Sequence, residues 1–592
     1  MNDIINKIKF LVIKHYWIII LSFLLTVLIF APLIVFPWVI GKEYQGININ
    51  WFGTDAHFYL TKGKEVLDGH SLGSPVLREG KNDPDPYLSY SEYILLAPIK
   101  LLGLAERANI ATVYNIYNFI GVFILIILIY FFVWQLSGKK LLAIAAALFA
   151  IGGYSIVYRK TLFYDDFNIY ARLIYPYASS LILFIYFNLL VKSLNSDKLK
   201  YKIFAGAVFG LLFYIYFYAW SFILALNGCL FLILLFKKDF FTARKVFWIS
   251  LIGLALGAYN LIRLFSSLNS EIGRQMAYFI WSSYGHGPIF SKIGFITLII
   301  FAVYYYKRRD DKNWPFILAV ISGGWVALNQ QIITGRMVQY AHYYWYFIVP
   351  LSIIIGCYMI WRLMDNEKIR KYLFLFLLAV VFINTVGGQY RSFFMTLNIK
   401  RNEQSYRPII NVLNSDKQPG VILADQANMY LLTIYTSHDL FWHQAATFNQ
   451  VPLQRLKDAL FVYFYLNKKA RNNFADYLTA IGQDPKSRGT YYQTLFRNLE
   501  GYWSGFDYYA YMNKITKADK ELALRRPAII SKLNDEYTET VLRNNGINKI
   551  LKKYGVNYIV WNRNNNPECD LSAVPGLKPL TSYNNIYLYE LK

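Results

Sequence analysis

The feature that most constrains the fold of this chain is a run of 23 residues without a charge, from residue 17 to residue 39. Its sequence is WIIILSFLLTVLIFAPLIVFPWV. About 20 apolar helical residues cross the hydrocarbon core of a bilayer, and tryptophan near both ends is typical of the membrane interfaces. The run is too long for the core of a signal peptide, and no small-residue cleavage site follows it. We therefore expect a first transmembrane helix that stays in the protein as an anchor.

Ten further apolar runs predict a polytopic membrane protein, because each is close to the length of a membrane span. Only 16% of the 592 residues are charged, whereas ordinary soluble domains have about 25%. The expected fold class is an all-α membrane bundle of about eleven transmembrane helices. The further runs lie at about 110–136, 141–157, 173–191, 203–218, 219–236, 246–265, 287–306, 314–333, 344–361 and 372–388.

Lysine and arginine collect in alternate short loops, and they give the chain a formal charge of +25. With eleven spans, all six basic clusters fall on one side of the membrane, which the positive-inside rule identifies as cytoplasmic. We therefore expect a multi-pass cell-membrane protein with a cytoplasmic N-terminus and an extracytoplasmic C-terminus. Membrane topology accounts for most of the basic excess, so no nucleic-acid partner is expected. The clusters lie at residues 7–14, 139–140, 192–202, 237–245, 307–312 and 362–371.

Two long polar pieces are predicted to lie outside the cytoplasm: the first external loop, residues 41–107, and the tail, residues 391–592. In the tail, GVILADQ from Gly420 and YGVNYIVW from Tyr554 are apolar runs bounded by turn residues, which is typical of short buried strands. Residues 451–550 have a mostly helical pattern. We expect a transmembrane domain over residues 1–390 and an extracytoplasmic α/β domain over residues 391–592.

The first candidate site is GTDAHFYL in the first external loop, where Asp55 and His57 lie among aromatic residues. A partly desolvated carboxylate at the membrane boundary could act as a general base that takes a proton from a hydroxyl group. The alternative is structural, because Asp55 precedes a helical pattern and could cap the first amide groups of that helix.

The second candidate site is YRKTLFYDDFNIYAR, residues 158–172, in the short external loop before the fourth span. Paired carboxylates with cations at a membrane surface suit a metal ion or a phosphorylated lipid. The alternative is a surface loop whose charges neutralise one another. The charged residues of this loop are Arg159, Lys160, Asp165, Asp166 and Arg172.

A third candidate comprises Arg336, Gln339 and His342, which are spaced three residues apart and could share one helical face near the outer membrane boundary. A guanidinium group there could bind a lipid phosphate through two hydrogen bonds, or it could serve only as an interfacial anchor. In the tail, His438 and His443 have a spacing that resembles metal ligands, but no catalytic motif accompanies them. We expect these two histidines to be structural.

The order of these features resembles the GT-C superfamily of membrane glycosyltransferases. The resemblance covers about residues 1–390 and is architectural: an uncleaved first helix, a long first external loop with an acid, a second acid in the next external loop, and about eleven spans. It implies transfer of a sugar from a polyprenyl-phosphate carrier to an extracytoplasmic glycan, lipid or protein. By position, Asp55 matches the catalytic acid of the first loop, and Asp165 or Asp166 matches that of the second.

A divalent cation, Mg or Mn, could be held by Asp55 together with Asp165 or Asp166, of which Asp166 is the preferred candidate. The chain also departs from the family pattern. Its first-loop acid stands alone in GTDAH, and the tail has YWSGFDYY at residues 502–509 where oligosaccharyltransferases have WWDYG. Transfer of a single hexose or pentose is therefore expected in preference to transfer to a peptide sequon.

Two other functions are compatible with the sequence. A transporter or flippase of envelope precursors would have polar groups near the middle of its spans and broken helices, and neither is clear here. A non-catalytic relative that binds glycans would keep the fold with the lone Asp55. An enzyme should orient the acids of the second loop toward Asp55, whereas a glycan-binding protein has no need to do so.

Overall fold

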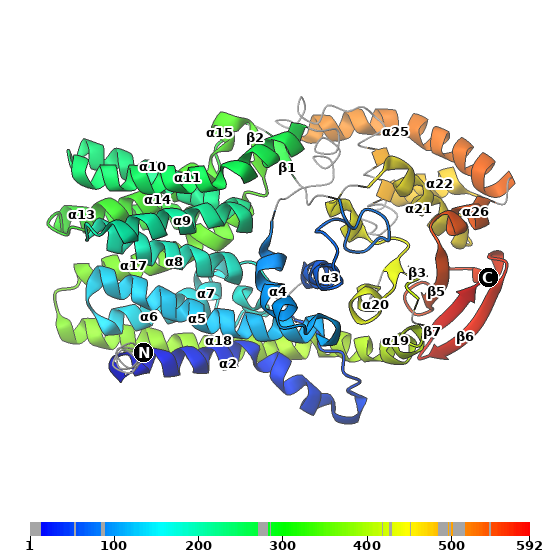
Figure 1. Ribbon diagram of the computed structural model, residues 1–592, viewed down its shortest axis with the longest axis horizontal. Coiled ribbons are helices and arrows are strands. Elements are labelled where there is room, and N and C mark those ends of the chain that lie inside the picture. The colour runs from blue at the N-terminus through cyan, green and yellow to red at the C-terminus, as the bar shows by residue number, and fades with distance from the viewer. Residues whose placement is uncertain are drawn as a thin grey trace.

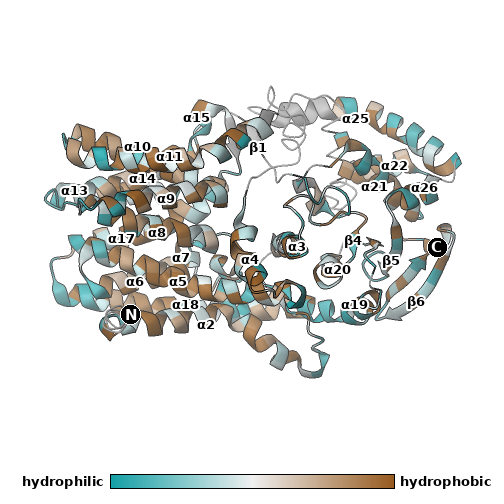
Figure 2. Cartoon of the chain, viewed as in Figure 1, coloured by the Kyte–Doolittle hydropathy of each residue, from teal (hydrophilic) through white to brown (hydrophobic). Residues whose placement is uncertain are grey.

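The computed structural model describes residues 13–51, 55–83, 89–269, 282–284, 286–416, 418–425, 429–449, 451–483, 495–496, 499–500, 515–543 and 546–592. Long helices form a bundle at one end of the molecule, and a domain of helices and strands forms the other end (Figure 1). Apolar residues predominate in the bundle, whereas the other end is more polar (Figure 2). The predicted fold class, a polytopic helical membrane bundle with an α/β domain, is confirmed.

All eleven predicted spans form helices, and eight helical segments among the described residues are long and apolar enough to cross a membrane. These segments contain α2 (Tyr16–Ile40), α5 (Ile110–Ser137), α8 (Tyr177–Leu194), α10 (Phe217–Phe236), α11 (Phe240–Asn269), α14 (Trp314–Leu328), α17 (Val349–Leu363) and α18 (Glu367–Glu403). The other three predicted spans form α6 (Lys140–Gly152), α9 (Leu199–Ile215) and α13 (Lys292–Lys307). With 13, 17 and 16 residues, they are shorter than a complete span, although they lie within the bundle (Figure 1).

The basic loops gather at the end of the bundle that is remote from the α/β domain (Figure 1). Lys140 donates a hydrogen bond of 2.9 Å to the carbonyl of Lys14, so the N-terminal segment lies beside the loop between α5 and α6. Arg362 forms an ion pair of 2.8 Å with Asp311, and Arg308 donates a hydrogen bond of 2.9 Å to the carbonyl of Arg362. Loops that are far apart in the sequence therefore share one end of the bundle.

Helix α18 connects the two ends of the molecule. Its 37 residues correspond to a length of about 55 Å. It runs along the bundle and continues into the α/β domain (Figure 1). The domain boundary that we predicted at residue 390 lies inside this helix, which is continuous there.

The α/β domain contains a five-stranded sheet with the order β4-β3-β5-β7-β6. Strand β3 is parallel to β4 and β5, and β7 is antiparallel to β5 and β6. The strands are β3 (Val421–Ala424), β4 (Asp439–Leu440), β5 (Val556–Asn562), β6 (Leu577–Tyr583) and β7 (Ile586–Leu591). The longer accompanying helices are α19 (Arg407–Leu413), α21 (Leu453–Leu466), α22 (Phe474–Gln483), α25 (Ile515–Tyr537) and α26 (Gly546–Lys553). The two predicted strands are thus β3 and β5.

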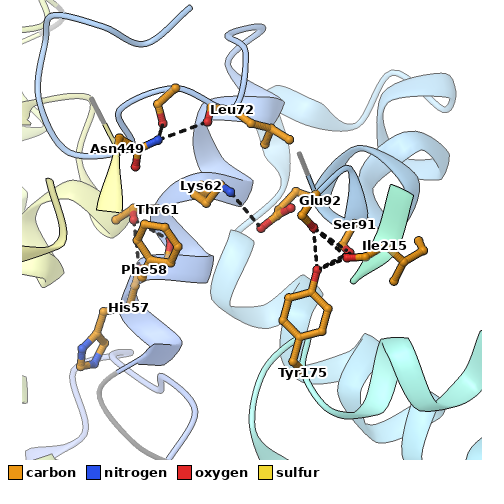
Figure 3. Close-up of polar contacts among 12 residues, drawn as sticks. His57, Phe58, Thr61, Lys62, Leu72, Ser91, Glu92, Tyr175, Ile215 and Asn449 are labelled. Atoms are coloured by element: carbon orange, nitrogen blue, oxygen red, sulfur yellow. Dashed lines mark hydrogen bonds and ion pairs between the residues drawn. The ribbon is translucent and has the colours of Figure 1, made fainter. Parts of the chain in front are cut away.

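The first external loop contributes α3 (Asp55–Leu67) and α4 (Ser91–Leu101), which lie between the bundle and the α/β domain (Figure 1). Lys62 on α3 pairs with Glu92 on α4 at 3.8 Å, and both side chains are buried (Figure 3). The hydroxyl groups of Ser91 and Tyr175 are 2.6 Å apart, and both lie within hydrogen-bond distance of the carbonyl of Ile215 at the end of α9. These contacts attach the first loop to the bundle.

Candidate functional site

The second external loop packs against α18 through Asn384 and Gly387. The amide oxygen of Asn384 accepts a hydrogen bond of 2.9 Å from the backbone N–H of Phe163. A Cβ atom at Gly387 would lie 2.2 Å from Cδ1 of Phe163, so a larger residue there would push the loop away. The close approach therefore depends on glycine in this helix.

The first and second external loops also meet each other. Asn50 of the first loop donates a hydrogen bond of 2.7 Å to the carbonyl of Ala171 in the second loop. Trp51 stacks on Phe393 of α18, with ring centroids 5.1 Å apart, and its ring lies 5.9 Å from that of Phe167. Residue 51, four residues before Asp55, is thus in contact with the residue that follows Asp166.

Two residues of these contacts, Asn384 and Phe167, also line a cavity of about 260 Å³. Its wall is formed by the end of α6, by α7 (Tyr154–Arg159), by the second external loop, by the turn that precedes α17 and by α18. The lining residues are Gly152, Tyr154, Ser155, Tyr158, Arg159, Tyr164, Asp166, Phe167, Asn168, Ile169, Arg172, Trp345, Tyr346, Asn384, Thr385, Gly388 and Gln389.

A carboxylate and a nearby cation lie at one side of this cavity. Desolvation by the surrounding protein raises the pKa of Asp166, while a 2.9 Å hydrogen bond from the N–H of Phe167 and the charge of Arg159 act in the opposite direction. The guanidinium group of Arg159 lies 4.7 Å from the ring centroid of Tyr158 and 4.6 Å from that of Tyr164. This stacking holds the cation beside the cavity.

Arg172 and an aromatic wall form another side. Arg172 donates a hydrogen bond to the hydroxyl of Tyr346. Tyr346 belongs to a π-helical turn, η4 (Tyr344–Ile348), and such turns occur frequently at functional sites. His342 stacks on Tyr346 with ring centroids 5.3 Å apart, and its Nδ1 lies 3.0 Å from the hydroxyl of Tyr216. His342 therefore supports the aromatic wall without lining the cavity.

The cavity brings together three of the predicted site residues, Arg159, Asp166 and Arg172. Lys160 and Asp165 belong to the same loop and are exposed, but they are not among the lining residues. Asp55 is the first residue of α3, and its side chain lies outside the part of the chain that the structure describes. The orientation of Asp165 and Asp166 toward Asp55 thus stays a prediction.

The expected helical face through residues 336, 339 and 342 is wrong. Helix α15 (Gln331–Thr334) ends at Gly335, whose φ is +67°, and Arg336 begins strand β2 (Arg336–Val338). This strand pairs with β1 (Ser282–Tyr284), so its backbone follows a ladder in place of a helix. Gln339 then has a φ of +35°, which separates it from the short helix of His342. The side chain of Arg336 lies outside the described residues.

His57 lies at the junction with the α/β domain. Its ring stacks on that of Tyr430 in α20 (Tyr430–Tyr435), with centroids 3.2 Å apart, and the Tyr430 hydroxyl donates to Glu403 at 2.9 Å. Lys400 pairs with the same glutamate at 3.0 Å. Burial, assisted by the charge of Lys400, lowers the pKa of His57 well below its ordinary value. His57 is not among the residues that line the cavity. A role of His57 in substrate binding therefore stays a prediction.

The two tail histidines are bound within the fold. His438 accepts a hydrogen bond of 2.8 Å from the N–H of Gly420, and His443 accepts one of 3.0 Å from that of Ala445. Among the described residues, no three His, Cys, Asp or Glu side chains are placed to hold a metal ion. The segment YWSGFDYY, residues 502–509, lies outside the described residues.

The sequence did not single out the aromatic residues of the cavity wall or the polar residues of α18 that line the cavity. Tyr154 and Trp345 could not be told from interfacial aromatic residues, which the ends of spans commonly contain. Asn384 and Gln389 had a usable signal, since polar side chains within or beside a span are candidates for function. Both occur in the segment NTVGGQ, at the end of an otherwise apolar run.

Comparisons with known proteins identify similar structures, while no family model and no curated protein sequence matches. ArnT from Cupriavidus metallidurans, bound to undecaprenyl phosphate, is 10% identical over 97% of this chain and 98% of its own, with a TM-score of 0.48. The oligosaccharyltransferase AglB from Archaeoglobus fulgidus, in complex with an inhibitory peptide and a dolichol-phosphate, is 11% identical over 93% of this chain and 70% of its own, with a TM-score of 0.45. Both are GT-C enzymes. At these identities no residue role is carried over from them.

Proposed function

We propose that this chain is a membrane glycosyltransferase that moves a single sugar from a polyprenyl-phosphate carrier to an extracytoplasmic acceptor. The observation that carries the proposal is the cavity that combines Asp166 with Arg159 and Arg172. Part of its wall is the second external loop, which joins α7 to α8 at the ends of α6–α7 and α8 opposite to the basic clusters at 139–140 and 192–202. By the positive-inside rule these ends are extracytoplasmic.

The reaction requires few groups from the protein. The bond between the anomeric carbon and the phosphate oxygen breaks, and the polyprenyl phosphate leaves with the electron pair. An acceptor hydroxyl oxygen forms the new bond to the anomeric carbon and loses its proton to a carboxylate base. Cations stabilise the negative charge on the departing phosphate.

Asp166 and the two arginines suit these roles. Asp166 has a raised pKa, which makes its carboxylate a better proton acceptor than an ordinary aspartate. Arg159 and Arg172 provide guanidinium groups that match the geometry of a phosphate. Asp55 is proposed as a second acid of the same site, with Asp165 beside it. If Mg or Mn takes part, Asp55 and Asp166 are the carboxylates that would hold the ion.

The test is transfer from polyprenyl phosphosugars by the purified full chain, with its native membrane fraction as the source of acceptors. Asp166→Asn keeps the size of the side chain but removes the base, so transfer should fall about 100-fold or more. Asp68→Asn is the matched control, because Asp68 is exposed on the first external loop and pairs only locally, at 3.5 Å, with Lys64. Undiminished transfer by Asp166→Asn would refute the role of this carboxylate.

Two other results would favour a different function. Binding of every donor without cleavage would favour a glycan-binding protein, and movement of intact donor across the membrane of vesicles would favour a flippase.

A further inference from the structure

Gln389 differs from the other polar residues that line the cavity. It lies on α18 with only 6% of its surface exposed, and it is one of the lining residues. Its side-chain oxygen, Oε1, has no hydrogen-bond partner among the described residues. Buried polar atoms in folded proteins nearly always have a partner, and an unpaired one is unfavourable for folding. An unpaired acceptor in the wall of a cavity therefore points to a ligand.

The neighbouring polar side chains already have partners within the protein. Asn384 accepts from the N–H of Phe163 and donates to the hydroxyl of Ser155 at 3.2 Å. The hydroxyl of Thr385 donates to the carbonyl of Val381 at 2.8 Å, within the same helix. These groups hold the fold together at the cavity, whereas Oε1 of Gln389, a residue of the same wall, has no such partner among the described residues.

The chemistry of the missing partner is restricted. A carbonyl oxygen only accepts hydrogen bonds, so the ligand must present a donor to it. An ionised phosphate consists of acceptors, which assigns it to Arg159 and Arg172 and not to Gln389. An ammonium group would be disfavoured because the charged lining residues are two cations, Arg159 and Arg172, and one carboxylate, Asp166. A neutral hydroxyl group can donate a hydrogen bond to Oε1, and it carries neither the negative charge of a phosphate nor the positive charge of an ammonium group.

We propose that Gln389 is a specificity-determining contact that accepts a hydrogen bond from a hydroxyl group of a neutral sugar whose phosphate is bound by Arg159 and Arg172. The proposal rests on the function proposed above and names the part of the donor that this residue recognises. Gln389 contributes to binding of the sugar and contributes nothing to binding of the unglycosylated carrier phosphate.

The test compares two probes with the full chain in detergent micelles: farnesyl phosphate and a panel of farnesyl phosphosugars with glucose, galactose, mannose or arabinose. The wild-type chain should bind at least one phosphosugar more tightly than farnesyl phosphate. Gln389→Leu should reduce that preference about tenfold while leaving the affinity for farnesyl phosphate unchanged, because one hydrogen bond to the sugar is lost. Gln389→Glu retains an acceptor oxygen and should retain most of the preference.

A stability measurement separates this role from a structural one. Because Oε1 has no partner among the described residues, Gln389→Leu should leave the thermal unfolding midpoint unchanged or raise it. A structural glutamine would lower it. Ser392→Ala is the matched control, since Ser392 is also buried on α18 but its hydroxyl donates to the carbonyl of Gly388 at 2.8 Å. This control should leave the preference for the sugar intact.

The outcomes distinguish the two proposals. If neither probe binds to the wild-type chain, the proposed function and this inference both fail. If farnesyl phosphate binds but no sugar adds affinity, or if Gln389→Leu weakens both probes equally, the role of Gln389 is refuted while phosphate binding stands.

Discussion

Asp166 is subject to opposing influences that are visible at the level of single residues. Desolvation by the surrounding protein favours its protonated form, while the N–H of Phe167 and the positive charge of Arg159 favour its carboxylate form. Arg159 contacts the rings of Tyr158 and Tyr164, so its charge is kept near the cavity. The protonation of the proposed base should therefore depend in part on this guanidinium group.

We predict that Arg159→Gln shifts the acid limb of the profile of transfer rate against pH to higher pH. Without the cation the pKa of Asp166 rises, so the carboxylate is protonated, and the base lost, at a higher pH than in the wild-type chain. The measurement is the transfer rate at saturating donor across the acid range. Arg159→Lys should restore the original limb, because it restores the charge.

The control for this prediction is Arg401→Gln. Arg401 forms an ion pair of 2.8 Å with Glu43 and is not among the residues that line the cavity. Its removal should leave the pH profile unchanged. An identical acid limb in the wild-type chain and Arg159→Gln would show that Asp166 does not set the pH dependence.

At the scale of elements, the pairing of α3 with α4 determines where the first external loop lies. Lys62 and Glu92 are 4% and 1% exposed, so the charges meet in a desolvated contact (Figure 3). A buried ion pair adds little net stability, but a single remaining charge in such a place is strongly destabilising. The contact is thus better described as a constraint on packing than as a source of stability.

We predict that Glu92→Leu destabilises the chain by roughly 3–5 kcal/mol, because removing one member of a buried ion pair is strongly destabilising. Adding Lys62→Met should recover most of that loss, since the double variant removes both charges of the pair. The thermal unfolding midpoints of the purified chain measure both effects. A double variant as unstable as Glu92→Leu alone would contradict this account.

At the scale of the whole molecule, the basic loops gather at the end of the bundle that is remote from the α/β domain (Figure 1). The second external loop, which lines the cavity, joins α7 to α8 at the ends of the helices opposite to the basic clusters at 139–140 and 192–202. This arrangement places the proposed reaction on the side of the membrane that has few positive charges. Helix α18 links the two ends, because it begins beside the basic loops and contributes Asn384 and Gln389 to the cavity. It then enters the α/β domain, so the cavity and that domain share a rigid element.

We predict that a reporter enzyme that is active only in the cytoplasm is silent when fused after Lys592 and active when inserted within residues 307–312. The reason is the distribution of lysine and arginine, which are retained on the cytoplasmic side during insertion. Reporter activity in intact cells, normalised to the amount of fusion protein, is the measurement. The reverse pattern would place the cavity in the cytoplasm and overturn the proposed orientation of the site.

Local chemistry along the chain was sufficient to predict the helical bundle and the two central strands. Apolar runs are recognisable without knowledge of their neighbours, because the bilayer sets the length of each. Strands β3 and β5 could also be recognised locally, because their apolar residues are bounded by turn residues. The loop that carries Asp166, Arg159 and Arg172 could be identified for a similar reason, since charged residues beside a span are conspicuous.

Contacts between segments that are distant in the sequence determined how the loops pack at the cavity and which of the predicted residues meet there. Phe163 and Asn384 are 221 residues apart, and Asn50 and Ala171 are 121 residues apart, yet these two hydrogen bonds close the loops around the cavity. The pairing of β1 with β2 likewise replaced the helical face expected for Arg336, because the backbone there found partners in another loop. The unpaired oxygen of Gln389 is also a property of its surroundings, because only the packed structure shows which partners a side chain lacks.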